Sequence, residues 1–121
     1  MNELAILITA RHWTSQYEWN QHHVLALKAG LNPAIADAVS RDERPAGMTE
    51  EEAIVHDFSR DLHNQKGVSD ALFKSALDKF GEQGVMDLIA VNGYYVLVSM
   101  TLNVDRAPVP GGKLPLMPLT K

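Results

Sequence analysis

The sequence predicts an all-α protein, a single-domain helical bundle, and three observations point to this class. Apolar residues recur every three or four positions over most of the chain, as they do on the buried face of a helix. Helix start signals precede the periodic segments at Asn32-Pro33 and Thr49-Glu50-Glu51-Glu52. Glycines follow them at Gly30, Gly67 and Gly81, where helices commonly end. A chain of 121 residues is long enough for one domain and too short for two.

The part of the chain that ends at Gly67 is expected to form four helices. The first covers residues 2–13, and the second runs from the capping residues Thr14 and Ser15 to about residue 29. The second helix carries one stripe made of Trp19, His22, His23, Ala26 and Leu27. The third covers residues 33–40, and a polar loop leads from it to the fourth, which begins at the capping box after residue 48.

The second half is expected to hold a helix over residues 69–81 and a long segment over residues 82–103. The run Tyr94–Val98 has a composition typical of strands, but the length of the segment favours a helix that is buried on most sides. Polar residues within Val85–Val104 would be costly in lipid, so we expect a core helix and no membrane span. Residues 1–104 are therefore assigned to the helical domain. Residues 105–121 form a tail rich in Pro and Gly, which we expect to wrap a neighbouring chain or to extend freely.

Composition narrows the class of protein. The formal net charge is −4 and the basic residues are scattered, which argues against a nucleic-acid partner. The absence of cysteine excludes disulfides, thiolate metal sites and thiol redox chemistry, and it fits a reducing cytoplasm. The start Met1-Asn2-Glu3 shows no signal peptide. We expect a cytoplasmic homo-oligomer, because the apolar last helix and the tail have too little chain to cover them.

Ser15, Glu18 and His22 are the first candidate site residues. They lie three and four positions apart, so a hydroxyl, a carboxylate and an imidazole share one face of the second helix. A desolvated Glu–His pair of this kind performs proton transfer in enzymes. The spacing alone leaves a second interpretation open, in which these residues form an ordinary solvated helix face.

Two segments of the chain resemble the carboxymuconolactone decarboxylase and alkylhydroperoxidase D-like superfamily. The first, Glu3–Leu31, contains the pattern Arg11-His12-Trp13, Tyr17-Glu18-Trp19 and His22, and the second is Asn92–Asn103. The peroxidase branch carries a glutamate, a Cys-x-x-Cys pair and a histidine, which match Glu3, the positions of Ser15 and Glu18, and His22. The resemblance implies an alkylhydroperoxidase D-like helical bundle that assembles as a trimer or hexamer.

The resemblance also implies roles for individual residues. Ser15 and Glu18 cannot be oxidised and reduced again, so a dithiol peroxidase is excluded and survives only as a family label. The decarboxylase branch implies a lyase that needs no cofactor and acts on a small cyclic or lactone carboxylic acid. Its implied catalytic residues are Glu3, Glu18 and His22. Its implied substrate-binding residues are Arg11, which would hold a carboxylate, Ser15, and Trp13 and Trp19, which would wall the pocket.

Each assignment has an alternative with no catalytic role. Glu3 would simply be an acid in the first turn of a helix, Arg11 would form a surface ion pair with Glu18, and both tryptophans would belong to the core. The chain as a whole could likewise be a non-catalytic oligomeric scaffold or ligand-binding protein. We expect no metal site, because His12, His22 and His23 lack further ligands at a diagnostic spacing. His56 and His63 are expected on the surface.

Overall fold

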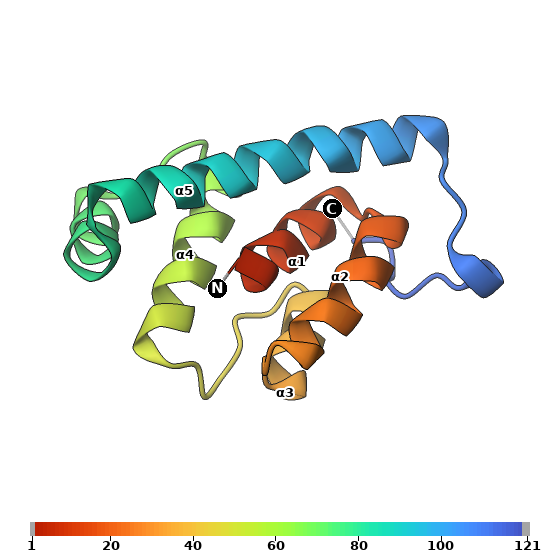
Figure 1. The fold of residues 1–121 in the computed structure, drawn as a ribbon, viewed down its shortest axis with the longest axis horizontal. Helices are drawn as coiled ribbons and strands as arrows, with labels where there is room; N and C mark the ends of the chain where they lie inside the picture. The colour runs from red at the N-terminus through yellow and green to blue at the C-terminus, as the bar shows by residue number, and fades with distance from the viewer. Residues whose placement is uncertain (1, 120–121) are drawn as a thin grey trace.

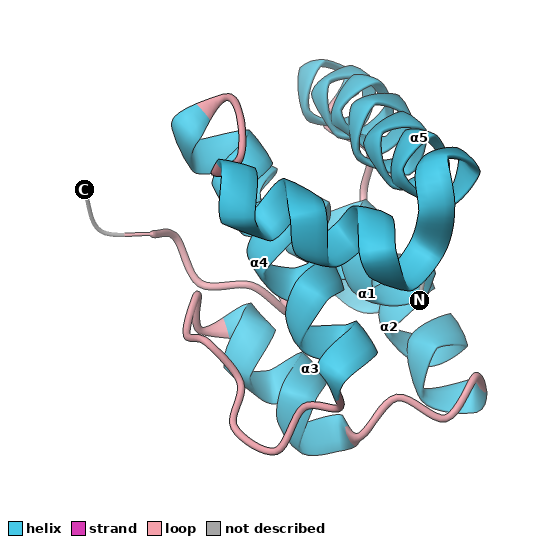
Figure 2. Cartoon of the chain, turned by 90° about the vertical axis from the view of Figure 1, so that its left-hand side faces the viewer, coloured by secondary structure: helices cyan, strands magenta, loops and turns pink. Residues whose placement is uncertain are grey.

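The computed structural model describes residues 2–119, which form five α-helices and one short 3-10 helix (Figure 1). They are α1 (Asn2–Trp13), α2 (Gln16–Lys28), α3 (Pro33–Ser40), α4 (Glu50–Gln65), α5 (Asp70–Asp105) and η1 (Pro110–Gly112). Figure 2 shows helices and loops only, and no strand occurs within the described range. The prediction of an all-α protein is therefore confirmed.

Helix α1 is the centre of the bundle. Its eight successive residues from Leu4 to Arg11 are all buried, and the helix packs against α2, α3, α4 and α5. In Figure 1 it lies beneath the long α5, between α4 and α2. A helix that is covered on every side needs apolar or internally bonded side chains around its whole circumference. The buried polar residues Thr9 and Arg11 on α1 accordingly form hydrogen bonds with other protein groups.

The start signals found in the sequence act as predicted in three helices. The Asn32 side chain accepts a hydrogen bond from the Ala34 amide, and the Ser69 side chain accepts one from the Leu72 amide. Thr49 and Glu52 form the reciprocal capping box at the start of α4. Such bonds satisfy amides that have no partner within the helix. Helix α2 differs, because its capping residue Ser15 makes no side-chain capping bond.

Helix α5 confirms two expectations about the second half and corrects a third. Gly81 has non-helical backbone angles, with φ of 74° and ψ of 176°, so two helical segments meet there at a kink and the predicted stop is confirmed. Tyr94–Val98 is helical, so its strand-like composition did not decide its structure. The expected burial on most sides is wrong. The residues of α5 that are buried are Ala76, Val85, Leu88, Asn92 and Ser99.

The opposite face of α5 carries an exposed apolar stripe. It consists of Met86, Ile89, Gly93, Leu97, Met100 and Val104, spaced three or four residues apart. By length and composition alone, α5 is also the one helix within residues 2–119 that could cross a membrane, and 22% of its apolar window is buried inside the chain. These positions are exposed in the single chain.

The tail folds back on its own chain. Leu116 is 1% exposed, and both its amide and its carbonyl bond to the side chain of Gln16, at 2.9 and 2.7 Å. The next carbonyl, of Met117, accepts a hydrogen bond from Arg11 at 2.7 Å. The expectation that the tail extends freely is therefore wrong for the segment around Leu116 and Met117, and the expectation that it wraps a neighbour stays a prediction. The tail folds back because the Leu116 side chain is buried and because the Gln16 amide group pairs with both main-chain groups of Leu116.

Candidate active site

Glu3, Glu18 and His22 form one connected cluster between α1 and α2. The Nδ1 atom of His22 lies 2.8 Å from Oε2 of Glu3, and its Nε2 atom lies 2.7 Å from Oε1 of Glu18. Both ring nitrogens therefore face a carboxylate at hydrogen-bonding distance. Only an imidazolium can donate from both nitrogens at once. In this geometry an imidazolium would donate one hydrogen bond to each carboxylate.

The local fold explains why these three side chains meet. Glu18 and His22 are one turn apart on α2, so they share a face. Thr14, with a φ of 48°, turns the chain between α1 and α2, and the Ser15 amide bonds to the Ala10 carbonyl at 2.8 Å. This tight connection packs α2 against α1, and it brings Glu3 in the first turn of α1 to His22.

Burial orders the cluster from the inside to the outside. The side chains of Glu18, His22 and Glu3 are 6%, 15% and 28% exposed, respectively. The hydrogen bond to Glu18 is the largest influence on His22, and with Glu3 it raises the pKa of the imidazole against the opposing effect of burial. Glu18 is thus the inner end of the cluster, and Glu3 is the end that water or another molecule reaches.

An aromatic residue that was not among the predicted site residues packs on His22. The Tyr95 ring meets the imidazole edge-on, with centroids 5.3 Å apart and an interplanar angle of 76°. Burial raises the pKa of the Tyr95 phenol, and the charges of Glu18 and Glu3 raise it further. The available signal was the segment Asn92-Gly93-Tyr94-Tyr95, which the resemblance covered without assigning a role to it.

Arg11 does not join the cluster through any of its hydrogen bonds. Its guanidinium donates to the Ser40 carbonyl at 2.9 Å, to the Thr14 hydroxyl at 2.9 Å and to the Met117 carbonyl. The alternative of a surface ion pair with Glu18 is wrong, because Arg11 is 2% exposed and forms no ion pair within residues 2–119. Burial lowers its pKa, and the charge of Asp42 opposes that effect. These contacts give Arg11 a structural role.

The tryptophans lie in different surroundings. Trp19 is 3% exposed, belongs to the core cluster and stacks on His23, with ring centroids 5.7 Å apart. Trp13 is half-buried and meets His12 edge-on, and its buried Nε1 has no hydrogen-bond partner. The ring that contacts His22 is that of Tyr95, so the aromatic group at the cluster differs from the pair that the sequence predicted.

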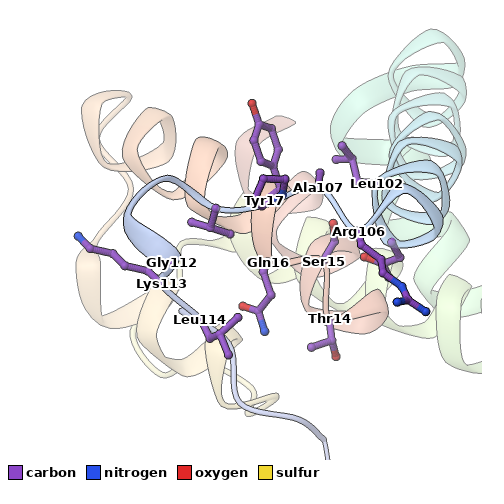
Figure 3. Close-up of a pocket in the computed structure, with 13 residues that line it drawn as sticks. Thr14, Ser15, Gln16, Tyr17, Leu102, Arg106, Ala107, Gly112, Lys113 and Leu114 are labelled. Atoms are coloured by element: carbon purple, nitrogen blue, oxygen red, sulfur yellow. The ribbon is translucent and has the colours of Figure 1, made fainter.

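Ser15 is the one predicted substrate-binding residue that lines a cavity of ligand size. The cavity measures about 370 Å³ and lies between the start of α2, the end of α5 and the returning tail (Figure 3). Glu3 lines a separate hollow of about 370 Å³, together with the end of α2. Neither Arg11 nor either tryptophan lines the cavity beside Ser15.

The prediction that His56 and His63 lie on the surface is wrong for His56, and His63 is half-buried. His56 is 4% exposed and bonds to Asp57 at 2.9 Å. His63 Nε2 lies 2.9 Å from the Thr9 hydroxyl, and burial lowers its pKa to about 4. Thr9 in turn bonds to Asn92. Within residues 2–119 no group of three or more His, Asp or Glu side chains has a geometry that could hold a metal ion.

Comparison of the chain with family models, with curated proteins and with solved structures gave no match. The fold and the cluster therefore rest on the chain's own geometry.

Proposed function

We propose that the protein is a decarboxylase-like lyase that acts on a small cyclic or lactone carboxylic acid by proton transfer. The observation that carries the proposal is the bridge of His22 between two carboxylates, at 2.8 and 2.7 Å. Imidazole and carboxylate groups held at this distance exchange protons readily, and the hydrogen bonds to Glu18 and Glu3 raise the pKa of His22. The resemblance of the first thirty residues supplies the substrate class.

The increase in exposure from Glu18 through His22 to Glu3 defines the direction in which the proposed proton transfer runs. Glu18 is the inner group and lies one turn from Ser15, which lines the cavity, whereas Glu3 is the outer group. In the proposed relay His22 would pass its Nε2 proton to Glu18, which would deliver it to the substrate. Glu3 then draws the replacement proton from solvent. This sequence of transfers requires no cofactor and no metal ion.

The proposed reaction consumes one proton for each carbon dioxide released. The bond between the substrate ring carbon and its carboxylate breaks, carbon dioxide leaves, and the electron pair remains on the ring as an enolate. The cluster then delivers a proton to that carbon and takes one from water. Proton transfer by a positioned side chain typically contributes a factor of about 10² to 10⁴ in rate. The edge of Tyr95 would limit the access of water to His22.

A second candidate function rests on a different observation. The exposed apolar stripe of α5 is suited to binding another protein surface, so a non-catalytic oligomeric scaffold would also use this fold. Dithiol peroxidase chemistry has no support, because the sequence contains no cysteine. The two remaining candidates differ in whether the cluster around His22 turns over a substrate.

The test is a panel of cyclic and lactone acids incubated in deuterated water, with carbon dioxide release and deuterium incorporation measured by mass spectrometry. We expect turnover by the native chain and a loss of about 10²-fold or more in His22→Gln. His23→Gln is the matched control, because His23 is the adjacent histidine and stacks on Trp19 outside the cluster. Equal rates in native protein and His22→Gln, or no turnover of any acid, would contradict the proposal.

A further inference from the structure

The cavity beside Ser15 is built mainly from apolar side chains. Leu102 on α5 and Ala107, Val109 and Leu114 in the tail line it, together with Tyr17 at the start of α2. Its volume of about 370 Å³ falls within the range of small-molecule sites. Figure 3 shows the tail passing in front of the first turn of α2, so the walls come from segments far apart in the sequence. The walls suit a ligand with an apolar body.

Ser15 brings an unsatisfied polar group to this cavity. The residue is completely buried, and its Oγ atom has no hydrogen-bond partner. Buried hydroxyls without a partner are costly, so such a group calls for an explanation. In Figure 3 its oxygen points toward Ala107 and Leu102. A ligand atom that accepts a hydrogen bond at this place would satisfy the hydroxyl.

Ser15 occupies the N-terminal capping position of α2, but its side chain does not cap the helix. Because Ser15 makes no side-chain capping bond, it does not satisfy the amides of the first turn of α2, which have no acceptors within the helix. A helix start of this kind favours negative charge. Helix α2 has 13 residues, which is long enough for this effect. Ser15, Gln16 and Tyr17 all line the cavity, so the hydroxyl and the start of α2 border the same space.

The charges around the cavity have one sign. Its lining contains Arg106 and Lys113 and no acidic residue, although the whole chain has a net charge of −4. Neither cation forms an ion pair with a residue in the range 2–119. In Figure 3 they extend to opposite sides, Arg106 toward the end of α5 and Lys113 away from it. The two cations would therefore attract an anion to the rim of the cavity through their charge, without both contacting it directly.

We infer that this cavity binds a small carboxylic acid, with the carboxylate at Ser15 and the start of α2 and the apolar body against Leu102 and the tail. The inference deepens the proposed function, on which it rests for the link between the bound acid and Glu18. Binding itself requires no turnover. The tail supplies much of the wall, so residues 107–114 form part of the binding site.

The probe is benzoate, with neutral benzamide as its counterpart of the same shape. Titration of the ¹⁵N-labelled full chain should shift the amide resonances of Gln16, Tyr17 and the tail, with a dissociation constant on the order of 1 mM for so small a ligand. Benzamide should bind at least about tenfold more weakly, because it carries no charge for the rim and the helix start. Equal binding of both probes, or shifts elsewhere only, would overturn the inference.

Two substitutions locate the interaction. Ser15→Ala should weaken benzoate binding by about threefold to tenfold, the worth of one hydrogen bond, while Ser75→Ala on the exposed part of α5 should leave it unchanged. Arg106→Gln should weaken binding by about twofold to fivefold. Its matched control is Lys66→Gln. Lys66 and Arg106 share a left-handed backbone conformation, with φ of 63° and 55°, but Lys66 does not line the cavity. Unchanged binding in both Ser15→Ala and Arg106→Gln would refute the site.

The outcome separates this inference from the proposed function. Saturable binding at Gln16 and Tyr17 without turnover of any acid would support the site and reject the lyase. Turnover of an acid whose rate and Michaelis constant are unaffected by Ser15→Ala, with no benzoate shifts at the start of α2, would support the lyase and reject this site. Thermal denaturation of each variant verifies that it is folded.

Discussion

The imidazole of His22 is the charge partner of Glu18, the more buried of the two carboxylates that it bridges. Their atoms Nε2 and Oε1 lie 2.7 Å apart across one helix turn, and the Glu18 side chain is only 6% exposed. A carboxylate with so little contact with water needs a hydrogen-bonding or charged partner within the protein. This dependence leads to two predictions about how His22 titrates.

The two glutamates should affect the pKa of His22 unequally. The hydrogen bond to Glu18 is the largest cause of the raised pKa, ahead of the one to Glu3. We therefore expect Glu18→Gln to lower the pKa of His22 more than Glu3→Gln does, as measured by NMR titration of the imidazole resonances. His23 serves as the internal reference in each spectrum. A larger effect of Glu3→Gln would show that the outer carboxylate dominates.

The stabilising effect of His22 should be confined to lower pH. Its pKa in the folded protein is raised above the ordinary value of 6.5, so the folded state holds the proton more tightly than the unfolded state. The resulting stabilisation is fully present below about pH 6.5 and is lost as the pH rises through the folded-state pKa. Urea denaturation of native protein and His22→Gln should show a difference in unfolding free energy that shrinks above pH 6.5. A difference that grows with pH would contradict this assignment.

His63 should act in the opposite direction. Burial lowers its pKa to about 4, with the charge of His12 adding to the effect, so the folded state resists its protonation. The unfolded chain takes up that proton near pH 6.5, and the free energy of unfolding should therefore fall between about pH 6.5 and 4. We expect His63→Gln to lose less stability over this interval than the native chain. Identical acid profiles would show that other groups control the acid sensitivity.

The returning tail should contribute to stability through Leu116. Replacing this fully buried side chain by alanine should lower the free energy of unfolding by about 2–4 kcal/mol. Leu114→Ala is the matched control in the same segment, because Leu114 is 75% exposed and should change stability by less than about 0.5 kcal/mol. Chemical denaturation measures both values. Equal effects would mean that the tail does not dock in solution as described.

The apolar stripe of α5 should hold copies of the chain together. We propose a homo-oligomer, trimeric or hexameric by the resemblance, and expect light scattering of the native chain at micromolar concentration to show it. Leu97→Lys, at an exposed position in the centre of the stripe, should yield monomers with unchanged thermal stability. Ser75→Lys lies before the bend at Gly81 and should leave the assembly intact. A native chain that is monomeric at this concentration would rule the oligomer out.

The sequence predicted those features that depend on local signals. Asn32, Thr49 and Ser69 cap the helices that they were expected to cap, because a capping bond spans only two or three residues. The face shared by Glu18 and His22 likewise follows from helical spacing alone. The approach of Glu3 depended on the resemblance, because spacing within one helix says nothing of its neighbour.

Features that depend on tertiary packing were missed. Periodicity does not reveal whether an apolar helix is covered on all sides, as α1 is, or on one side only, as α5 is. Tyr95 reaches His22 from a helix more than seventy residues further along the chain, and Leu116 is buried in spite of its proline-rich surroundings. Gly81 ends a helical segment as predicted, but local signals did not show that the next segment would begin at once across a kink.

Arg11 has a consequence for how related sequences would be compared. Two of its three hydrogen bonds go to main-chain carbonyls, those of Ser40 and Met117, which every amino acid provides. Substitution at either position would leave the acceptor in place, so no correlated change with Arg11 is required. Covariation between aligned positions would therefore overlook a contact that joins the first helix to segments 29 and 106 residues away.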